Sequence, residues 1–301
     1  AIFGTMITKR CGAKYVIDLY DNFESYGATK FPGILPLFIR AIRSANGITC
    51  VSPQLGVYVH DHYQCQAPQL VLENAIRADL FQPLDKFACR KQLGLPENAT
   101  IIGTAGALHK SRGTETLYRG YRLLAAEDNN LHLAIAGPRR RKDEVPTGDR
   151  VHDLGQLPHE TIPTFINALD VAVICNRDTA FGRYNFPQKA REILACGTPI
   201  VAASVGAMKD ILREHPECLF TPDNPASLAQ ALRRQVLQPT QIGEQIPSWA
   251  DMAVRLREFD AYLAEAEEFG FDTVELNIPD SPVYERLTQA LLESVADDLL
   301  A

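Results

Sequence analysis

Short apolar runs alternate with longer amphipathic stretches along most of the chain. Short runs that are apolar at successive positions are typical of strands buried on both faces, whereas apolar positions repeating every three or four residues are typical of helices. The runs predict strands at 15–18, 48–51, 70–72, 100–105, 131–136, 151–154, 171–175, 199–202 and 218–220. The stretches between them predict helices at 35–45, 114–127, 160–169 and 226–236. This alternation indicates βαβ units, and therefore an α/β fold whose parallel sheets are covered by helices on both sides.

The same pattern divides the chain into three parts. Residues 1–82 supply about half of a sheet, residues 83–238 supply a nearly complete doubly wound unit, and residues 239–301 form a helical extension of unknown role. Ligands of doubly wound folds bind beyond the carboxyl ends of the strands. The loops of interest therefore follow Ala105, Ala136, Cys175 and Ala203.

Both ends of the chain are harder to interpret. The tail predicts a long amphipathic helix at 249–269, a strand at 271–276 and a last helix at 284–300. The chain begins at Ala1 without a methionine, and its first residues have the helix-then-strand pattern of mid-domain sequence. We therefore expect the first domain to be incomplete and the sequence to be a fragment.

Composition narrows the function. Of the 301 residues, 46% are hydrophobic and the formal net charge is −7, which argues against non-specific binding to nucleic acid. No apolar run approaches the roughly 20 residues of a membrane span, and no signal peptide is apparent. The seven cysteines are odd in number, widely spaced and free of Cys-x-x-Cys pairs, so we expect reduced thiols and a cytoplasmic protein.

The segment FPQKAREILACGTPIVAA at 186–203 carries the most chemistry. Pro187 suits the first position of a helix, Gly197 ends it, and a short apolar strand follows. The amino terminus of a helix that faces a loop is a site for anions, and Glu192 lies about one turn inside it, where a carboxylate can accept hydrogen bonds from the hydroxyls of a sugar. The alternative is an ordinary surface helix with a solvated glutamate.

This segment resembles the donor-site signature of family four retaining glycosyltransferases, the glycosyl transferases group 1. Further pieces follow in the family's order from about residue 14 to 206: YVIDLYDN (15–22), ITCVS (48–52), LVLENAI (70–76), IIGTAGALHKSRG (101–113), LHLAIAGP (131–138) and VHDLG (151–155). The resemblance implies a GT-B fold of two Rossmann-like domains. It also implies a UDP- or GDP-sugar donor, retention of configuration, and no metal or separate cofactor.

The loop GALHKSRG at 106–113 can hold the diphosphate of such a donor. Gly106 allows a close approach of the backbone, and Lys110 and Arg112 supply cations. In the family an arginine follows the first glycine, whereas this chain has Ala107. The resemblance implies that Arg112 is the diphosphate cation, with Lys110 compensating for the absent arginine; the alternative is two exposed charges on a turn.

The 186–203 segment supplies the remaining donor contacts. The resemblance implies that Glu192 holds the ribose and that Lys189 lies near the phosphates; an ordinary ion pair spaced i, i+3 is the alternative. Many family members have a glutamate where this chain has Tyr184, so the sugar contact is open. Candidates for it are Arg183, Tyr184 and Asn185, with Phe186 beside them.

The acceptor side is represented by DLYDN at 18–22, at the end of a predicted strand. Asp21 can orient an acceptor hydroxyl or accept its proton, and is the third catalytic candidate with Arg112 and Lys189. Alternatively, Asp21 and Asn22 cap the next segment. The apolar stretch 31–43 predicts a core helix, or an edge that touches a membrane-borne acceptor at the inner face of the membrane. Six of the histidines show no metal-ligand spacing: His60, His62, His132, His152, His159 and His215.

We therefore expect a glycosyltransferase that moves a hexosyl group from a UDP- or GDP-sugar to a hydroxyl of a glycan or a lipid-linked sugar. Two alternatives remain open. One is a nucleotide-sugar epimerase, or a phosphorylase, of similar architecture. The other is a degenerate, partner-binding GT-B domain without catalysis, which Ala107 and Tyr184 favour.

Overall fold

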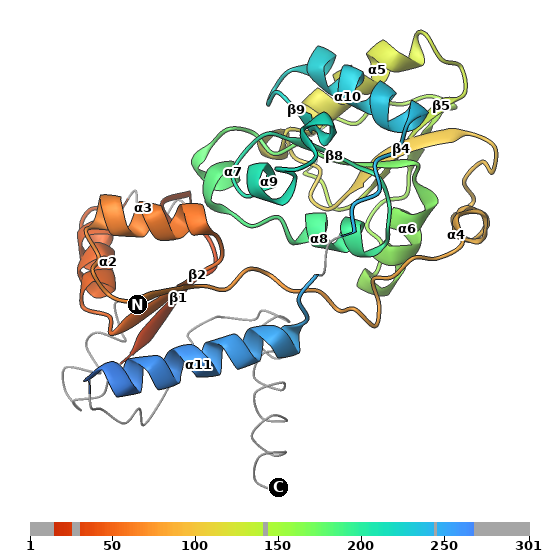
Figure 1. The fold of residues 1–301 in the computed structure, drawn as a ribbon. Helices are drawn as coiled ribbons and strands as arrows, with labels where there is room; N and C mark the ends of the chain where they lie inside the picture. The colour runs from red at the N-terminus through yellow and green to blue at the C-terminus, as the bar shows by residue number, and fades with distance from the viewer. Residues whose placement is uncertain (1–14, 26–30, 141–143, 244–245, 268–301) are drawn as a thin grey trace, which may run out of the picture. The chain divides into compact units, whose positions relative to one another are not determined.

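The structure is a computed structural model that describes residues 15–25, 31–140, 144–243 and 246–267 (Figure 1). The strand and helix expected at 271–276 and 284–300, and Cys11, lie outside these residues. The chain forms two compact units. The first contains Ala1–Ala75, Arg183–Phe186 and Pro247–Ala301, and the second contains Ile76–Gly182 and Pro187–Ile246. The domain limits at 82 and 238, which follow the sequence linearly, stay predictions.

The second unit contains a six-stranded parallel sheet. Its strands are β4 (Thr100–Ala105), β5 (Leu131–Ala136), β6 (Val151–Asp153), β7 (Val171–Ile174), β8 (Ile200–Ala203) and β9 (Leu219–Phe220). They lie in the order β6-β5-β4-β7-β8-β9, and Ile102 of β4 is in register with Val171 of β7. The chain therefore winds outward from β4 in one direction and then from β7 in the other, so the switch point of this doubly wound sheet lies between β4 and β7.

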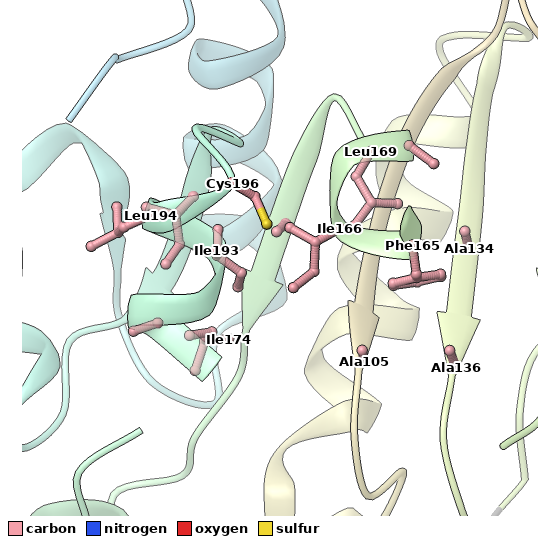
Figure 2. Packing of buried hydrophobic residues seen from close by; sticks show 14 of the residues in the cluster. Ala105, Ala134, Ala136, Phe165, Ile166, Leu169, Ile174, Ile193, Leu194 and Cys196 are labelled. Atoms are coloured by element: carbon pink, nitrogen blue, oxygen red, sulfur yellow. The ribbon is translucent and has the colours of Figure 1, made fainter. Parts of the chain in front are cut away.

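Helices cover both faces of this sheet because its strands are apolar at successive positions. Helices α5 (Thr114–Ala125) and α10 (Pro225–Leu237) pack on one face, against residues such as Ile102 and Val173. Helices α4 (Lys86–Leu93), α6 (Ile162–Ala168) and α8 (Gln188–Ala195) pack on the other. Figure 2 shows Ile166 of α6 and Ile193 of α8 within this second cluster. The short elements are α7 (Ala180–Tyr184), α9 (Met208–Ile211), η3 (Lys110–Arg112), η4 (His159–Thr161) and η5 (Pro216–Cys218).

A buried ion network closes the amino-terminal edge of the sheet. Arg90 of α4 is 2% exposed and donates to Asp170 Oδ2 at 2.6 Å and to the carbonyl oxygen atoms of Ala168 and Ala99 at 2.9 and 3.0 Å. Asp170 Oδ1 accepts a hydrogen bond from Lys86 Nζ at 2.7 Å. This network ties α4 to the first residues of β4 and β7, the two strands that flank the switch point.

The first unit contains a three-stranded parallel sheet in the order β1-β2-β3 among the described residues. Its elements are β1 (Val16–Leu19), η1 (Phe23–Ser25), α2 (Ile34–Arg43), β2 (Gly47–Cys50), α3 (Pro53–Tyr63), β3 (Gln69–Val71) and α11 (Trp249–Glu267). Helix α11 packs on β1 and β2: Phe259 lies in one cluster with Val16, and a Cβ on Gly47 would lie 2.6 Å from Leu263 Cδ1.

The nine strands predicted between residues 15 and 220 are all present, each within a residue or two of its expected limits. The cysteines at 50, 65, 89, 175, 196 and 218 are buried and free, as the reduced-thiol interpretation expects. The search for membrane-spanning helices covered the described residues, and none of their helices combines enough length with enough apolar character.

Candidate functional site

Gly106 begins the loop that follows β4, and its geometry requires a glycine. Its φ is +110°, and its N–H donates to Ala136 O at 2.8 Å, which ties the loop to the end of β5. A Cβ built on Gly106 would lie 3.0 Å from Lys189 Nζ and 3.3 Å from Lys189 Cε. The absence of a side chain at Gly106 therefore leaves the space that the lysine of α8 occupies.

Gly113 ends the same loop and brings it against the loop after β7. Its φ is +74°, and a Cβ there would lie 1.8 Å from the carbonyl oxygen of Cys175. Only glycine allows this approach of two backbones. The loops after β4 and β7 thus meet at the switch point, where doubly wound folds bind their ligands. Gly103 lies within β4, where a Cβ would collide with the backbone of Ala134 and the side chain of Leu169, so this glycine serves packing within the sheet.

Arg112 is the cation that this loop contributes. The Cζ atom of its guanidinium lies 3.8 Å from the ring centroid of Phe181, a stacking distance. The charge of Arg112 also acts on Lys189, whose pKa it lowers. Two cations from separate segments therefore share this part of the second unit.

Lys189 lies in the first turn of α8, and the pKa of its amine is lowered. Pro187, at the start of the helix, makes no capping hydrogen bond with its side chain. Desolvation lowers the pKa of Lys189 to about 8; the nearby charge of Glu192 opposes this shift and that of Arg112 adds to it. An anion that binds here would stabilise the charged form of this desolvated ammonium group, which lies near a second cation.

Glu192 lies one turn further along α8, and the pKa of its carboxyl group is raised. Burial raises the pKa of its carboxyl to about 7, while the charge of Lys189 and a hydrogen bond from Gln188 oppose the shift. A half-buried carboxylate at this position can accept hydrogen bonds from vicinal hydroxyls. The structure therefore brings together Gly106, Arg112, Lys189 and Glu192, and their roles in donor binding stay predictions.

Lys110 lies elsewhere. It is exposed and lines a hollow of about 190 Å³ along α5, together with Arg122 and Glu144. The sequence treated Lys110 and Arg112 as neighbouring cations of one site, but the 3-10 turn η3 points their side chains to different surroundings. Compensation by Lys110 for the absent arginine at Ala107 stays a prediction.

The four remaining donor candidates lie in the first compact unit, which contains Arg183–Phe186. The backbone oxygen of Tyr184 accepts a hydrogen bond from Ser52 Oγ at 2.7 Å, and that of Phe186 accepts one from Asn74 Nδ2 at 3.4 Å. Asn185 Oδ1 is buried and has no hydrogen-bond partner among the described residues. Their roles in sugar binding stay predictions.

On the acceptor side, Asp18 and Asp21 have different surroundings. Asp18 lies within β1 and is hydrogen-bonded to Thr49 Oγ1 at 2.5 Å, and burial raises its pKa. Asp21 follows the strand and is partly exposed; its Oδ1 accepts from the N–H of Asn22 at 2.7 Å. Asn22 Oδ1 in turn accepts from the N–H of Glu24 at 2.8 Å, so the capping alternative holds for Asn22.

A carboxylate that accepts hydrogen bonds from two tyrosines lies beside this loop, and the sequence did not suggest it. Glu24 Oε1 accepts hydrogen bonds from Tyr58 Oη at 2.8 Å and from Tyr63 Oη at 2.7 Å. The ring of Tyr58 lies 4.5 Å from that of Tyr184, centroid to centroid. No sequence spacing marks the cluster, because Glu24 is 34 and 39 residues from the tyrosines that donate to it.

The histidines form one notable pair. His132 Nδ1 and His152 Nε2, on neighbouring strands β5 and β6, are 2.9 Å apart, and burial lowers the pKa of both rings. Within the part of the chain that the structure describes, no group of three or more His, Cys, Asp or Glu side chains is arranged to hold a metal ion.

Comparison with known proteins identifies the second unit. A sequence model described as Glycosyl transferases group 1 matches residues 99–237. Residues 99–237 are thus similar in sequence to the group 1 glycosyltransferases. The match spans β4 to α10, and therefore includes Gly106, Arg112, Lys189 and Glu192. The family predicted from the sequence is thus confirmed.

Individual relatives of this part of the chain agree with the match. D-inositol 3-phosphate glycosyltransferase of Geodermatophilus obscurus is 28% identical over 191 residues, which are 58% of this chain and 41% of that protein. D-inositol 3-phosphate glycosyltransferase 1 of Catenulispora acidiphila is 28% identical over 195 residues, 58% of this chain and 46% of the relative. The chain thus spans less than half the length of these curated relatives.

Solved structures confirm the fold. Sucrose-phosphate synthase from Thermosynechococcus elongatus matches 84% of this chain with 68% of its own, at a TM-score of 0.67 and 21% identity. Anabaena HepE in complex with UDP matches 98% of this chain with 76% of its own, at a TM-score of 0.66 and 20% identity. Both are GT-B glycosyltransferases, so the predicted fold class of Rossmann-like units with parallel sheets is confirmed.

Proposed function

We propose that the protein is a glycosyltransferase that transfers a hexosyl group from a UDP- or GDP-sugar to a hydroxyl of a glycan or a lipid-linked sugar, with retention of configuration. The observation that carries the proposal is the position of Lys189 Nζ against Gly106, beside Arg112 and at the switch point of the sheet. The diphosphate of a sugar nucleotide is an anion that these two cations can bind.

The same residues account for the departure of the nucleotide. As the bond to the sugar breaks, negative charge grows on the diphosphate, and two fixed cations stabilise that charge without reorganising. The Lys189 amine, with a pKa of about 8, is also able to donate a proton to the departing oxygen near neutral pH. Glu192 holds the ribose, and Asp21 orients the acceptor hydroxyl.

The curated relatives and HepE suggest which compounds to try first. The relatives are named for D-inositol 3-phosphate, which makes an inositol phosphate a suitable first acceptor. HepE was also solved in complex with UDP-glucose, which makes that compound a suitable first donor.

Calorimetric titration of UDP and GDP tests the proposal. We expect one nucleotide to bind the wild type, and Glu192→Gln to weaken that binding at least tenfold because the ribose loses its charged acceptor. Unchanged binding in Glu192→Gln would remove this residue from the site. Incubation with the sugar nucleotide alone then tests for an epimerase, which would convert the donor without an acceptor. We expect no conversion to an epimer.

A further inference from the structure

Phe181 is not among the site residues proposed from the sequence, yet the guanidinium of Arg112 lies over its ring. Arg112 Cζ is 3.8 Å from the ring centroid, and both side chains are half-buried. Stacking engages the flat face of a guanidinium and uses none of its N–H groups, which lie in the plane. The contact with Phe181 therefore does not compete with hydrogen bonds that the guanidinium makes in its own plane, including those to an oxyanion.

The segment that carries Phe181 is itself fixed. It follows β7, and its helix α7 folds back so closely that a Cβ on Gly182 would lie 2.1 Å from the carbonyl oxygen of Arg177. Arg177 Nε donates to Asp223 Oδ1 at 3.0 Å. The φ of Asp223 is +56°, a left-handed conformation that is uncommon outside glycine. An ion pair thus ties the loop after β7 to the loop after β9.

We propose that Phe181 is a positioning residue for diphosphate binding, which holds the Arg112 guanidinium near Lys189 before the nucleotide arrives. The inference rests on the proposed function, since it concerns the same site. An unsupported arginine loses rotamer freedom when a phosphate binds, and a stacked one has lost it already. Phe181 therefore acts through Arg112 and increases affinity for the phosphates, not for the base or ribose.

A double-mutant cycle by calorimetry tests this role. The variants are Phe181→Leu, Phe181→Tyr, Arg112→Met and the Phe181→Leu/Arg112→Met pair, each titrated with UDP, GDP and the two nucleosides. We expect Phe181→Leu to weaken binding of the preferred nucleotide about fivefold to tenfold, and Phe181→Tyr to stay within about twofold of wild type. The double variant should bind no more weakly than Arg112→Met, and Phe181→Leu should leave nucleoside binding unchanged.

Two further variants make the result specific. Phe87→Leu is the matched control, because Lys86 Nζ lies 5.9 Å from the Phe87 ring in a cation–π pair on a residue outside the site; we expect no change in affinity. Arg177→Gln should weaken binding in the same direction as Phe181→Leu, by a smaller factor. Unfolding midpoints measured for all variants show whether each is folded.

The outcomes separate this inference from the proposed function. Wild-type protein that binds neither nucleotide would overturn the proposed function, and this inference with it. Nucleotide binding that Phe181→Leu leaves unchanged, tightens, or weakens additively with Arg112→Met would overturn only the role of Phe181. An equal loss of nucleoside affinity would also contradict it, because it would show a general effect on the fold.

Discussion

The ammonium group of Lys189 lies against the bare face of Gly106, where a Cβ would stand 3.0 Å from Nζ. This relationship joins the first turn of α8 to the loop after β4, which are 83 residues apart along the chain. It also places a desolvated amine at the edge of the sheet where doubly wound folds bind ligands. The proposed diphosphate site depends on this single approach.

Gly106→Ala should therefore impair nucleotide binding more than stability. The new methyl group displaces the lysine and must adopt a positive φ, so we expect affinity for the preferred nucleotide to fall at least tenfold and the free energy of unfolding to fall by about 1–2 kcal/mol. Calorimetry and urea unfolding measure the two quantities. Gly94→Ala is the control, because Gly94 also has a positive φ (+66°) but has no atom within 4 Å of its Cβ position. Equal affinities for Gly106→Ala and Gly94→Ala would contradict the role of the approach.

Nucleotide affinity should depend on pH with a maximum between about 7 and 8. The pKa of Lys189 is lowered to about 8, so the charged amine that attracts phosphate is lost as the pH rises through 8. The pKa of Glu192 is raised to about 7, so the carboxylate that accepts the ribose hydroxyls is lost as the pH falls through 7. Titrations from pH 5.5 to 9.5, a range chosen to bracket both groups by about 1.5 units, measure both limbs.

Two variants assign the limbs of this profile. Glu192→Gln should flatten the acid limb relative to wild type, a comparison in which the ionisation of the nucleotide itself cancels. Lys189→Arg, which stays charged throughout, should remove the alkaline limb. An alkaline limb that persists in Lys189→Arg would mean that another group titrates there.

How much of this was predictable from sequence depends on which interactions decide each feature. Strands such as β4 and β5 were predicted to the residue, at 100–105 and 131–136, because a strand buried on both faces leaves an uninterrupted apolar run. Lys189 and Glu192 were predicted because their helix has a distinctive start and end. Such features depend on residues that are consecutive in the sequence.

Other features depend on where side chains point, which the pattern of neighbouring residues does not predict. Lys110 and Arg112 are two residues apart in one short turn, yet only Arg112 acts on Lys189. The stacking of Arg112 on Phe181 joins residues far apart in sequence, and α7, which carries Phe181, is only five residues long. Side-chain direction in turns is set by tertiary contacts, so these relationships required the structure.

The ion network of Arg90, Asp170 and Lys86, at the opposite edge of the sheet, should affect stability and not nucleotide binding. Arg90→Met leaves the half-buried Asp170 without its guanidinium partner and three backbone carbonyl groups without their donor, and we expect it to lower the free energy of unfolding by about 3–5 kcal/mol. Lys86→Met removes the more exposed partner of the same carboxylate and should cost less than about 1 kcal/mol. Urea unfolding measures both, and similar losses for the two variants would contradict the network as described. Nucleotide affinity of folded Lys86→Met should equal that of wild type.

Gly113→Ala should destabilise the second unit severely. Its Cβ would lie 1.8 Å from the carbonyl oxygen of Cys175, so the loops after β4 and β7 must separate. We expect a loss of about 3 kcal/mol or more in the free energy of unfolding. Gly148→Ala, which has a positive φ but no neighbour within 4 Å, isolates the backbone term. A Gly113→Ala variant as stable as Gly148→Ala would show that the two loops do not meet as described.

The central claim is that Lys189, Arg112 and the backbone at Gly106 together hold the diphosphate of a sugar nucleotide. A crystal structure of the protein bound to UDP or GDP tests it most directly. The account predicts phosphate oxygens within hydrogen-bond distance of Lys189 Nζ and of the Arg112 guanidinium, with the ribose hydroxyls on Glu192. A nucleotide whose phosphates lie away from Lys189, for example in the hollow beside Lys110 and Arg122, would contradict it.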